Sequence, residues 1–159
     1  MVRPRYFVAV ALSLVMLCCK QHAAFPEVRD INSVHITLRR SICNASCPSY
    51  TIEISGDGSV TYEGREDVAV QGTEHARIPP QKVRDLIELF RRADFYSLPD
   101  AYESGVSGRP YYTTILWIDG RDKKVVDYDG REVGMPASVT ELEDAIDRAA
   151  NSERWVGKR

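Results

Sequence analysis

The sequence predicts an α+β domain in which one antiparallel sheet of about six strands packs against two α-helices. Short runs of alternating apolar and polar residues fill the first half of the chain. Two segments with apolar residues at helical spacing lie further on, and a length of 159 residues suits one domain. We expect this single domain at residues 34–157, with its N-terminal half rich in strands.

The expected strands of the first half each show one apolar and one polar face, which is typical of a half-buried strand. They are residues 34–39, 50–54, 60–63 and an irregular fourth strand made of residues 68–70 and 75–78. Two glycines flank an aspartate at residues 56–58, which is a tight-turn signal. The second and third strands are therefore expected to form a hairpin.

The first helix is expected to begin at Pro79–Pro80, because proline suits the first helical turn, where its missing N–H is not needed. Its apolar residues fall on one stripe: Val83, Leu86, Ile87 and Phe90. An aromatic-rich loop at residues 94–102 and a glycine-rich loop at residues 104–110 are expected next.

Residues 112–118 are apolar in both phases, which predicts a central strand covered on both faces. A turn at residues 119–122 leads into a partner strand at residues 124–128. Ser138 and Glu141 have the spacing of a capping box, which predicts the start of the second helix. The apolar face of that helix is expected to hold Val139, Leu142, Ala145, Ile146 and Ala149, and Trp155 is expected to fold back onto the domain.

The N-terminus has the pattern of an export signal. Arg3 and Arg5 precede an apolar run at residues 6–17, which is too short for a stable membrane span. Cys18 and Cys19 follow, as in a bacterial lipoprotein signal in which a cysteine becomes lipid-modified. We expect a signal peptide at residues 1–19, a polar tether at 20–33, and a domain that is periplasmic or lipid-anchored. Ordinary signal-peptidase cleavage near residues 23–24 is the alternative.

Export places the chain where disulfides persist, and Cys43 and Cys47 lie between two expected strands. A structural disulfide that fixes the turn is therefore expected. A redox-active pair is an alternative, although redox motifs usually set the cysteines closer together at a helix N-terminus. Zinc binding is a further alternative, and it requires the fold to bring His35 and His75 to the cysteines.

Composition and motifs exclude several function classes. The net charge is −2 and the basic residues are interspersed with acidic ones, which argues against nucleic-acid binding. The glycines of the 104–110 loop are not followed by a lysine, so this is not a phosphate loop, and no catalytic triad is indicated. Four acidic residues offer carboxylates for a cation or acid–base site, but we assign them to turns and an exposed sheet face: Asp119, Asp127, Asp129 and Glu132. No cofactor and no metal is expected.

The expected binding surface is the glycine-rich loop with Arg109, Tyr111 and Tyr112, because binding sites tend to lie on loops held by a rigid scaffold. Together with the leader, this predicts a non-enzymatic envelope protein that binds another envelope protein or a polymer. Its contact with the membrane is expected through the N-terminal lipid. The alternative is a redox or metal-binding protein that uses Cys43 and Cys47.

The chain resembles a bacterial family of domains of unknown function, number 6438, over roughly residues 34–156. The resemblance is carried by Cys43, Cys47 and several stretches: residues 48–50, 56–64, 93–98, 110–114, 126–130 and 142–147, with Trp155. Asn44 and Ala45 stand where relatives often have an aromatic residue and a glycine. The resemblance implies a small exported or lipid-anchored domain, and it brings no activity.

Overall fold

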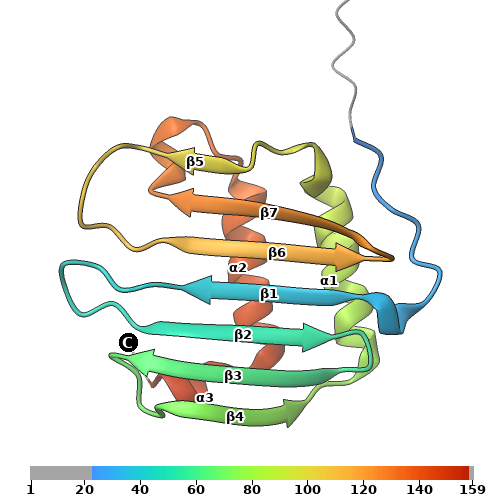
Figure 1. Ribbon diagram of the computed structural model, residues 1–159, viewed down its shortest axis with the longest axis horizontal. Coiled ribbons are helices and arrows are strands. Elements are labelled where there is room, and N and C mark those ends of the chain that lie inside the picture. The colour runs from blue at the N-terminus through green and yellow to red at the C-terminus, as the bar shows by residue number, and fades with distance from the viewer. Residues whose placement is uncertain (1–22, 158–159) are drawn as a thin grey trace, which may run out of the picture.

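The computed structural model of the chain describes residues 23–157, and the expected α+β class is confirmed there (Figure 1). The expected signal peptide at residues 1–19, with Cys18 and Cys19, lies outside the described residues. Within them the chain forms one sheet of seven strands with helices packed on it.

The strand order is β4-β3-β2-β1-β6-β7-β5, and every neighbouring pair is antiparallel except β7 and β5. The strands are β1 (His35–Arg40), β2 (Ser49–Ser55), β3 (Ser59–Glu66), β4 (Gly72–Arg77), β5 (Ala101–Glu103), β6 (Tyr112–Ile118) and β7 (Arg121–Tyr128). The central strand is β1, where Leu38 faces Ile52 of β2 and Thr114 of β6. The seventh strand, β5, comes from a stretch that was expected to be a loop, because three residues are too few to show alternation.

Two longer helices cover one face of the sheet, and the other face is open (Figure 1). They are α1 (Pro80–Arg92) and α2 (Ala137–Ala150), and a short α3 (Glu153–Val156) follows. Single-turn 3₁₀ helices occur at η1 (Ile31–Ser33), η2 (Phe95–Ser97) and η3 (Gly130–Val133). No helix in the described part of the chain combines the length and apolar character that a bilayer crossing needs.

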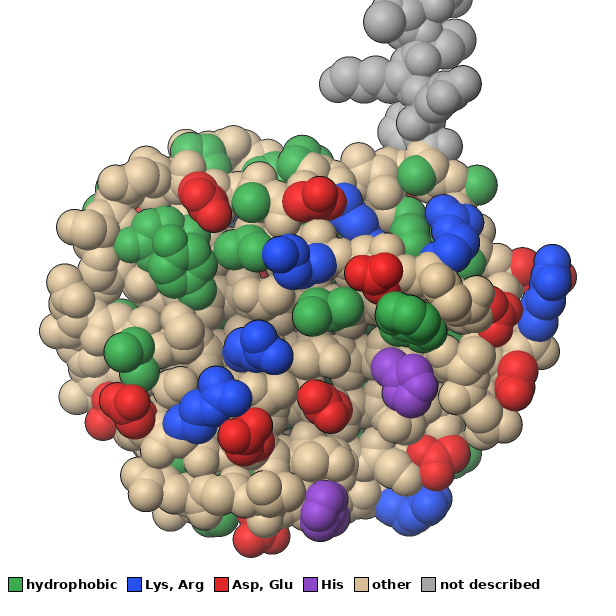
Figure 2. All heavy atoms as spheres, viewed as in Figure 1, with side chains coloured by type: hydrophobic (Ala, Val, Ile, Leu, Met, Phe, Trp, Pro, Cys, Tyr) green, Lys and Arg blue, Asp and Glu red, His purple; other side chains and the backbone are tan. Residues whose placement is uncertain are grey.

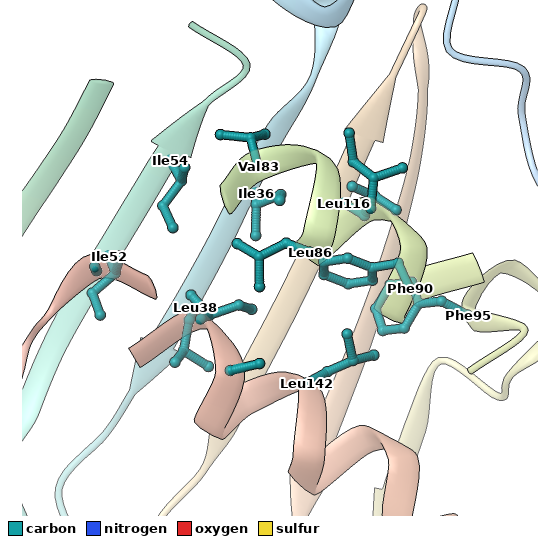
Figure 3. Packing of buried hydrophobic residues seen from close by; sticks show 14 of the residues in the cluster. Ile36, Leu38, Ile52, Ile54, Val83, Leu86, Phe90, Phe95, Leu116 and Leu142 are labelled. Carbon is teal, nitrogen blue, oxygen red and sulfur yellow. The ribbon is translucent and has the colours of Figure 1, made fainter. Parts of the chain in front are cut away.

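The core lies between the sheet and the two long helices (Figure 3). The alternation expected for β1 is present, since Ile36 and Leu38 are fully buried while His35 is exposed. The expected stripe of α1 is buried: Val83, Leu86, Ile87 and Phe90. Burying one such side chain contributes about 1.5–3 kcal/mol relative to leaving it in water. The apolar periodicity of the strands and helices therefore explains why the helices pack on the sheet.

The expectation that β6 is covered on both faces is wrong. Both long helices lie on the same face of the sheet, so the second apolar phase of β6 lies on the open face. Trp117 is 42 % exposed there, and Ile115 is only partly buried. A strand with apolar residues in both phases can therefore lie centrally in the sheet while helices cover only one of its faces.

Two further local expectations are wrong. The second helix has no capping box, because it begins at Ala137 after Pro136 and no side chain caps it. Pro136, with its φ of −60°, is the N-cap residue, so the helix begins two residues before the position that a Ser138 cap would need. The fourth strand also excludes residues 68–70, whose backbone N–H groups at 69 and 70 donate instead to carbonyls at the C-terminal end of the chain. Trp155 does fold back, since it is 6 % exposed and stacks on a tyrosine of β3.

Residues 23–33, which form most of the expected polar tether, are packed against the domain. Pro26 is buried, and Phe25, Val28 and Ile31 pack partly buried against the core. The apolar residues of this segment have no regular spacing, so a periodicity analysis does not detect that they dock.

Candidate functional site

The loop that joins β1 to β2, residues 41–48, is closed by a disulfide between Cys43 and Cys47, as the spacing predicts. Their Cα atoms are 5.5 Å apart, which lies within the usual range for a disulfide. The sulfurs lie in a loop between two strands, and no helix begins at either cysteine. The bridge therefore fixes one turn of the chain.

Replacing both Cys43 and Cys47 with serine is expected to lower the free energy of unfolding by about 2 kcal/mol, because the bridge closes only a short loop. The far-UV circular dichroism spectrum should stay that of the native fold. Urea unfolding of the oxidised wild-type chain and of the double variant measures the difference. Complete unfolding of the variant would show that the bridge holds more than this one loop.

The disulfide loop and the glycine-rich loop form one connected surface. The Ser41 backbone N–H donates to the Tyr111 carbonyl (2.9 Å), and the Tyr111 N–H donates to the Ser41 hydroxyl (2.9 Å). The Asn44 N–H donates to the Gly108 carbonyl (3.1 Å). Gly108 has a φ of +83°, and a Cβ atom there would lie 2.3 Å from the Asn44 side-chain nitrogen, so this close approach requires glycine. The glycine-rich loop is joined in turn to η3, because Arg109 pairs with Asp129, the N-cap residue of η3 (3.5 Å). We call the surface formed by residues 41–48, residues 104–111 and η3 the disulfide end.

Exposed apolar side chains gather at the disulfide end. Among the described residues, five large apolar side chains are exposed, and four of them are here: Ile42, Val106, Tyr111 and Val133, each 44–50 % exposed. The fifth is Trp117, on the open face of the sheet. On that open face, Figure 2 shows basic and acidic side chains interspersed, without a basic stripe. Apolar side chains that gather on one surface are a feature of interaction sites.

The structure separates the three residues expected to form the binding surface. Tyr111 is exposed, and its ring stacks on the last residue of β7 with centroids 4.1 Å apart. Arg109 is exposed and forms an ion pair with Asp129 (3.5 Å). Tyr112 lies on the helix-covered face, with the Arg40 guanidinium 4.3 Å from its ring centre. Tyr112 lines a hollow with residues 46–48, so it borders the disulfide end from a different side than Arg109 and Tyr111.

A buried ion pair beneath the disulfide end joins β1 to α2. Arg40 is 5 % exposed. Its Nε donates to Asp147 Oδ2 (2.9 Å), and its Nη2 forms an ion pair with the same oxygen (2.8 Å). The hydroxyls of Tyr50 (2.9 Å) and Ser152 (2.6 Å) donate to Asp147 Oδ1. Burial alone would lower the pKa of Arg40, but the Asp147 carboxylate raises it, and the resulting pKa lies above the ordinary value. Arg40 therefore stays charged and holds α2 to the sheet.

Two buried carboxyl groups lie near this ion pair. Glu143 of α2 is 1 % exposed, and neither of its carboxyl oxygens has a hydrogen-bond partner among the described residues. Burial, followed by the negative charge of Asp127, raises the pKa of Glu143 to about 8, while Arg40 lowers it. Burial also raises the pKa of Asp127, whose Oδ1 accepts from the Gly130 N–H (2.7 Å). Glu143 is therefore largely protonated at neutral pH.

Two hollows border this cluster, and neither is lined by Glu143 or Asp127. The larger, of about 350 Å³, is lined by Arg40, Asp147 and residues around them. The smaller lies beside the disulfide loop. It measures about 180 Å³ and is lined by Arg40, Ser46, Cys47, Pro48 and Tyr112. A general acid or base must come within hydrogen-bonding reach of the reacting group, so the geometry does not favour acid–base catalysis here. A further hollow, of about 560 Å³, lies between residues 28–31 and α1, and charged side chains form much of its lining.

The zinc alternative finds no support in the described residues. His35 begins β1 and Cys43 follows its far end, so the strand separates them. His75 lies on β4, with its Nδ1 3.4 Å from the Thr61 hydroxyl. No group of three or more His, Cys, Asp or Glu side chains suited to a metal ion occurs in residues 23–157.

The four acidic residues weighed from the sequence are not brought together. Asp119 lies in the turn before β7, where it accepts from the Arg29 N–H (3.2 Å) and from a serine hydroxyl of η1. Asp127, Asp129 and Glu132 lie at the opposite end of β7 or just beyond it. Of the four, only Asp127 is buried. Sequence reasoning missed the buried charges Arg40 and Glu143.

Comparison with protein families gives one match. The model of a family described as a domain of unknown function (DUF6438) matches residues 34–150. This range includes the disulfide end, both buried carboxyl groups and the Arg40–Asp147 ion pair. Comparison with curated proteins finds no match.

Proposed function

The chain belongs to the family of the domain of unknown function DUF6438, and from this premise we propose that it is an exported, lipid-anchored envelope protein whose disulfide end binds another protein. The proposal is carried by one observation: four of the five exposed large apolar side chains in residues 23–157 gather at that end. Such a cluster is characteristic of a protein-binding surface.

The loops at the disulfide end are preorganised, which also supports binding. The disulfide closes one loop, and backbone hydrogen bonds tie it to the other. The buried Arg40–Asp147 ion pair anchors the strand that leads into the disulfide loop. A surface whose shape is set before contact loses less conformational entropy on binding.

Export and lipid anchoring are supported by the leader and by the disulfide. The basic start, the short apolar run and the cysteines at 18 and 19 match a lipoprotein signal. A disulfide persists in an oxidising compartment. Mass spectrometry of the mature N-terminus tests this part of the proposal: a diacylglyceryl-cysteine is expected, whereas a start near residues 23–25 would contradict it.

A double replacement, Ile42→Ser with Tyr111→Ala, is expected to weaken partner binding at least tenfold, because it removes two exposed apolar contacts from the disulfide end. The partner is first cross-linked to the wild-type chain in envelope membranes. Its affinity for each variant is then measured with purified components. Trp117→Ala, which removes an exposed aromatic side chain from the open sheet face, is the matched control and should bind as the wild type does.

Three outcomes would contradict the binding proposal. The wild-type chain could yield no reproducible protein partner, the double variant could bind as tightly as the control, or a cell-envelope polymer could be retained in place of a protein.

The redox alternative makes a different prediction for the same disulfide. A reactive thiol usually needs a stabilised thiolate, as at a helix N-terminus, and neither Cys43 nor Cys47 lies at one. Thiol titration after mild reductant should therefore find both sulfurs still bonded in the folded chain and free only after denaturation and reduction. Ready reduction of the folded chain would favour the redox function.

A further inference from the structure

We propose that the lipid-anchored chain lies with the β5 edge of its sheet against the bilayer that holds its lipid, while the β4 edge points away. This inference rests on the proposed lipid anchor and adds a fixed orientation to it. The two edges are the outer strands of the seven-stranded sheet. In this orientation the β5 edge contacts the surface of the bilayer in which the chain's lipid is inserted.

The first described residues are held beside η2, which leads into β5. The Ser97 hydroxyl donates to the Ala23 carbonyl (3.4 Å), and the Phe25 ring packs edge-on against the Tyr96 ring with centroids 5.5 Å apart. The Arg91 guanidinium lies over the Phe25 ring, 5.1 Å from its centre. Figure 1 shows the start of the described chain at this same corner of the molecule. The chain therefore reaches the domain next to the β5 edge.

The remainder of the segment is held as closely. The Arg29 N–H donates to Asp119 (3.2 Å), and the Ser33 hydroxyl donates to the same carboxylate. The Ile31 carbonyl lies so near Gly56 that a Cβ atom there would be 1.6 Å from its oxygen. Only glycine permits this approach. Residues 23–33 therefore belong to the folded body and add no length to a tether.

The free tether is consequently short. Four residue steps separate Cys19 from Ala23, and five separate Cys18 from it. At about 3.5 Å per residue, a fully extended chain covers about 14–18 Å. The sheet has seven strands, and at about 4.8 Å per spacing its edges lie about 29 Å apart. The tether is shorter than the sheet is wide, so the sheet cannot stand upright with its β4 edge on the bilayer and its β5 edge farthest from it.

The charges beside the attachment point are compatible with a lipid surface. Arg91 and Arg121 are exposed, and their guanidinium groups lie over the rings of Phe25 and Tyr96. A basic side chain near an anionic membrane contributes about 1 kcal/mol. Two exposed acidic residues at the β5 edge act against this contribution, Asp100, which pairs with Lys123, and Glu103. The disulfide loop joins β1 to β2, away from the β5 edge (Figure 1), so this orientation leaves that loop exposed, whereas the glycine-rich loop and η3 adjoin β5 and lie nearer the bilayer.

Energy transfer from the protein to the membrane tests the orientation. The lipidated full chain is placed in vesicles of phosphatidylethanolamine and phosphatidylglycerol (3:1) that carry a headgroup acceptor dye. A donor dye is attached at Ala101→Cys on β5 or at Thr73→Cys on β4, both exposed positions. The disulfide is left intact, and any leader cysteine without lipid is changed to alanine. Transfer should be strong from position 101 and weak from position 73, because about 29 Å separates the two edges.

A longer tether is the matched control. Inserting twenty Gly/Ser residues after Lys20 adds about 25 Å of flexible chain, which should make the two transfer efficiencies similar. Equal efficiencies in the chain of natural length would overturn the orientation.

Failure of the lipid anchor is recognised separately, because the mature chain would then lack a diacylglyceryl-cysteine. In that case a chain that begins at Cys19 is coupled there to a maleimide-lipid, and the donor is attached through p-azidophenylalanine at position 101 or 73, which the maleimide does not modify. Equal transfer from its two edges would likewise overturn the orientation.

Discussion

Replacing Arg40 with alanine is expected to lower the free energy of unfolding by about 3–5 kcal/mol, as removal of one partner of a buried ion pair usually does. The Asp147 side chain, only 18 % exposed, would keep its negative charge and lose its cation. Glu143 and Asp127 would lose the one positive charge that lowers the pKa of both. The Arg40 guanidinium also lies over the Tyr112 ring, so the truncation removes that contact as well.

Urea unfolding of Arg40→Ala and of Arg39→Ala gives a matched comparison. Arg39 is the neighbouring residue of β1, but it is exposed on the opposite face of the sheet, so its loss should change the free energy of unfolding by at most about 0.5 kcal/mol. The double replacement Arg40→Met with Asp147→Asn should be less destabilising than Arg40→Ala, because no unpaired charge remains buried. Equal effects of Arg39→Ala and Arg40→Ala would show that the ion pair does not hold α2 to the sheet.

Local pattern was sufficient for most of the fold. Burial of one face forces alternation on a strand, which is why Ile36 and Leu38 identified β1, and why Val83 and Leu86 identified the inner face of α1. The fold class followed because these elements must bury their apolar faces on one another. No long-range information was needed for that step.

Tertiary pairing decided what the pattern could not. β5 exists because residues 101–103 pair in parallel with β7, and a three-residue strand carries no periodic signal. The open face of β6 follows from both long helices crossing the other face, which no local feature of residues 112–118 encodes. The docking of Phe25 on Tyr96 is also a contact between distant segments.

The candidate site was predicted in part. The loops were identified because glycine and cysteine mark turns and bridges, and Tyr111 does lie on the surface. Tyr112 was assigned to the same surface, and it borders the disulfide loop from the helix-covered face of the sheet. The buried charges had a signal that was not used: Arg40 continues the inward phase of Ile36 and Leu38, and Glu143 lies within the apolar stripe of α2. Charged residues in an inward phase indicate a buried polar cluster.

The stability of the domain is expected to fall as the pH rises from about 4.5 to about 8, because of Glu143. Its pKa is 4.5 when unperturbed and about 8 in the folded chain. Between these values the folded state holds a proton that the unfolded state releases, so the free energy of unfolding decreases by up to about 1.4 kcal/mol per pH unit. The raised pKa of Asp127 acts in the same direction. The pKa values of Asp57, Asp100 and Asp119 are lowered in the folded chain, so these groups stabilise the fold at neutral pH. Their contribution is lost only as the pH falls below about 4.

Glu143→Gln should remove most of this pH dependence, since the amide is neutral throughout. At pH 8 the variant should be more stable than the wild type by on the order of 3 kcal/mol, and at pH 5 the two should be similar, because Glu143 is protonated there. Urea unfolding at pH 5, 6, 7 and 8 measures both slopes, and Glu141→Gln, an exposed change on the same helix, should keep the wild-type slope. The free energy of unfolding of Glu143→Gln should keep a smaller dependence on pH, which comes from Asp127. If the slopes of Glu143→Gln and the wild type coincide, the carboxyl group between α2 and the sheet is not the proton-binding group, and the neutral form assigned to it at pH 7 is wrong.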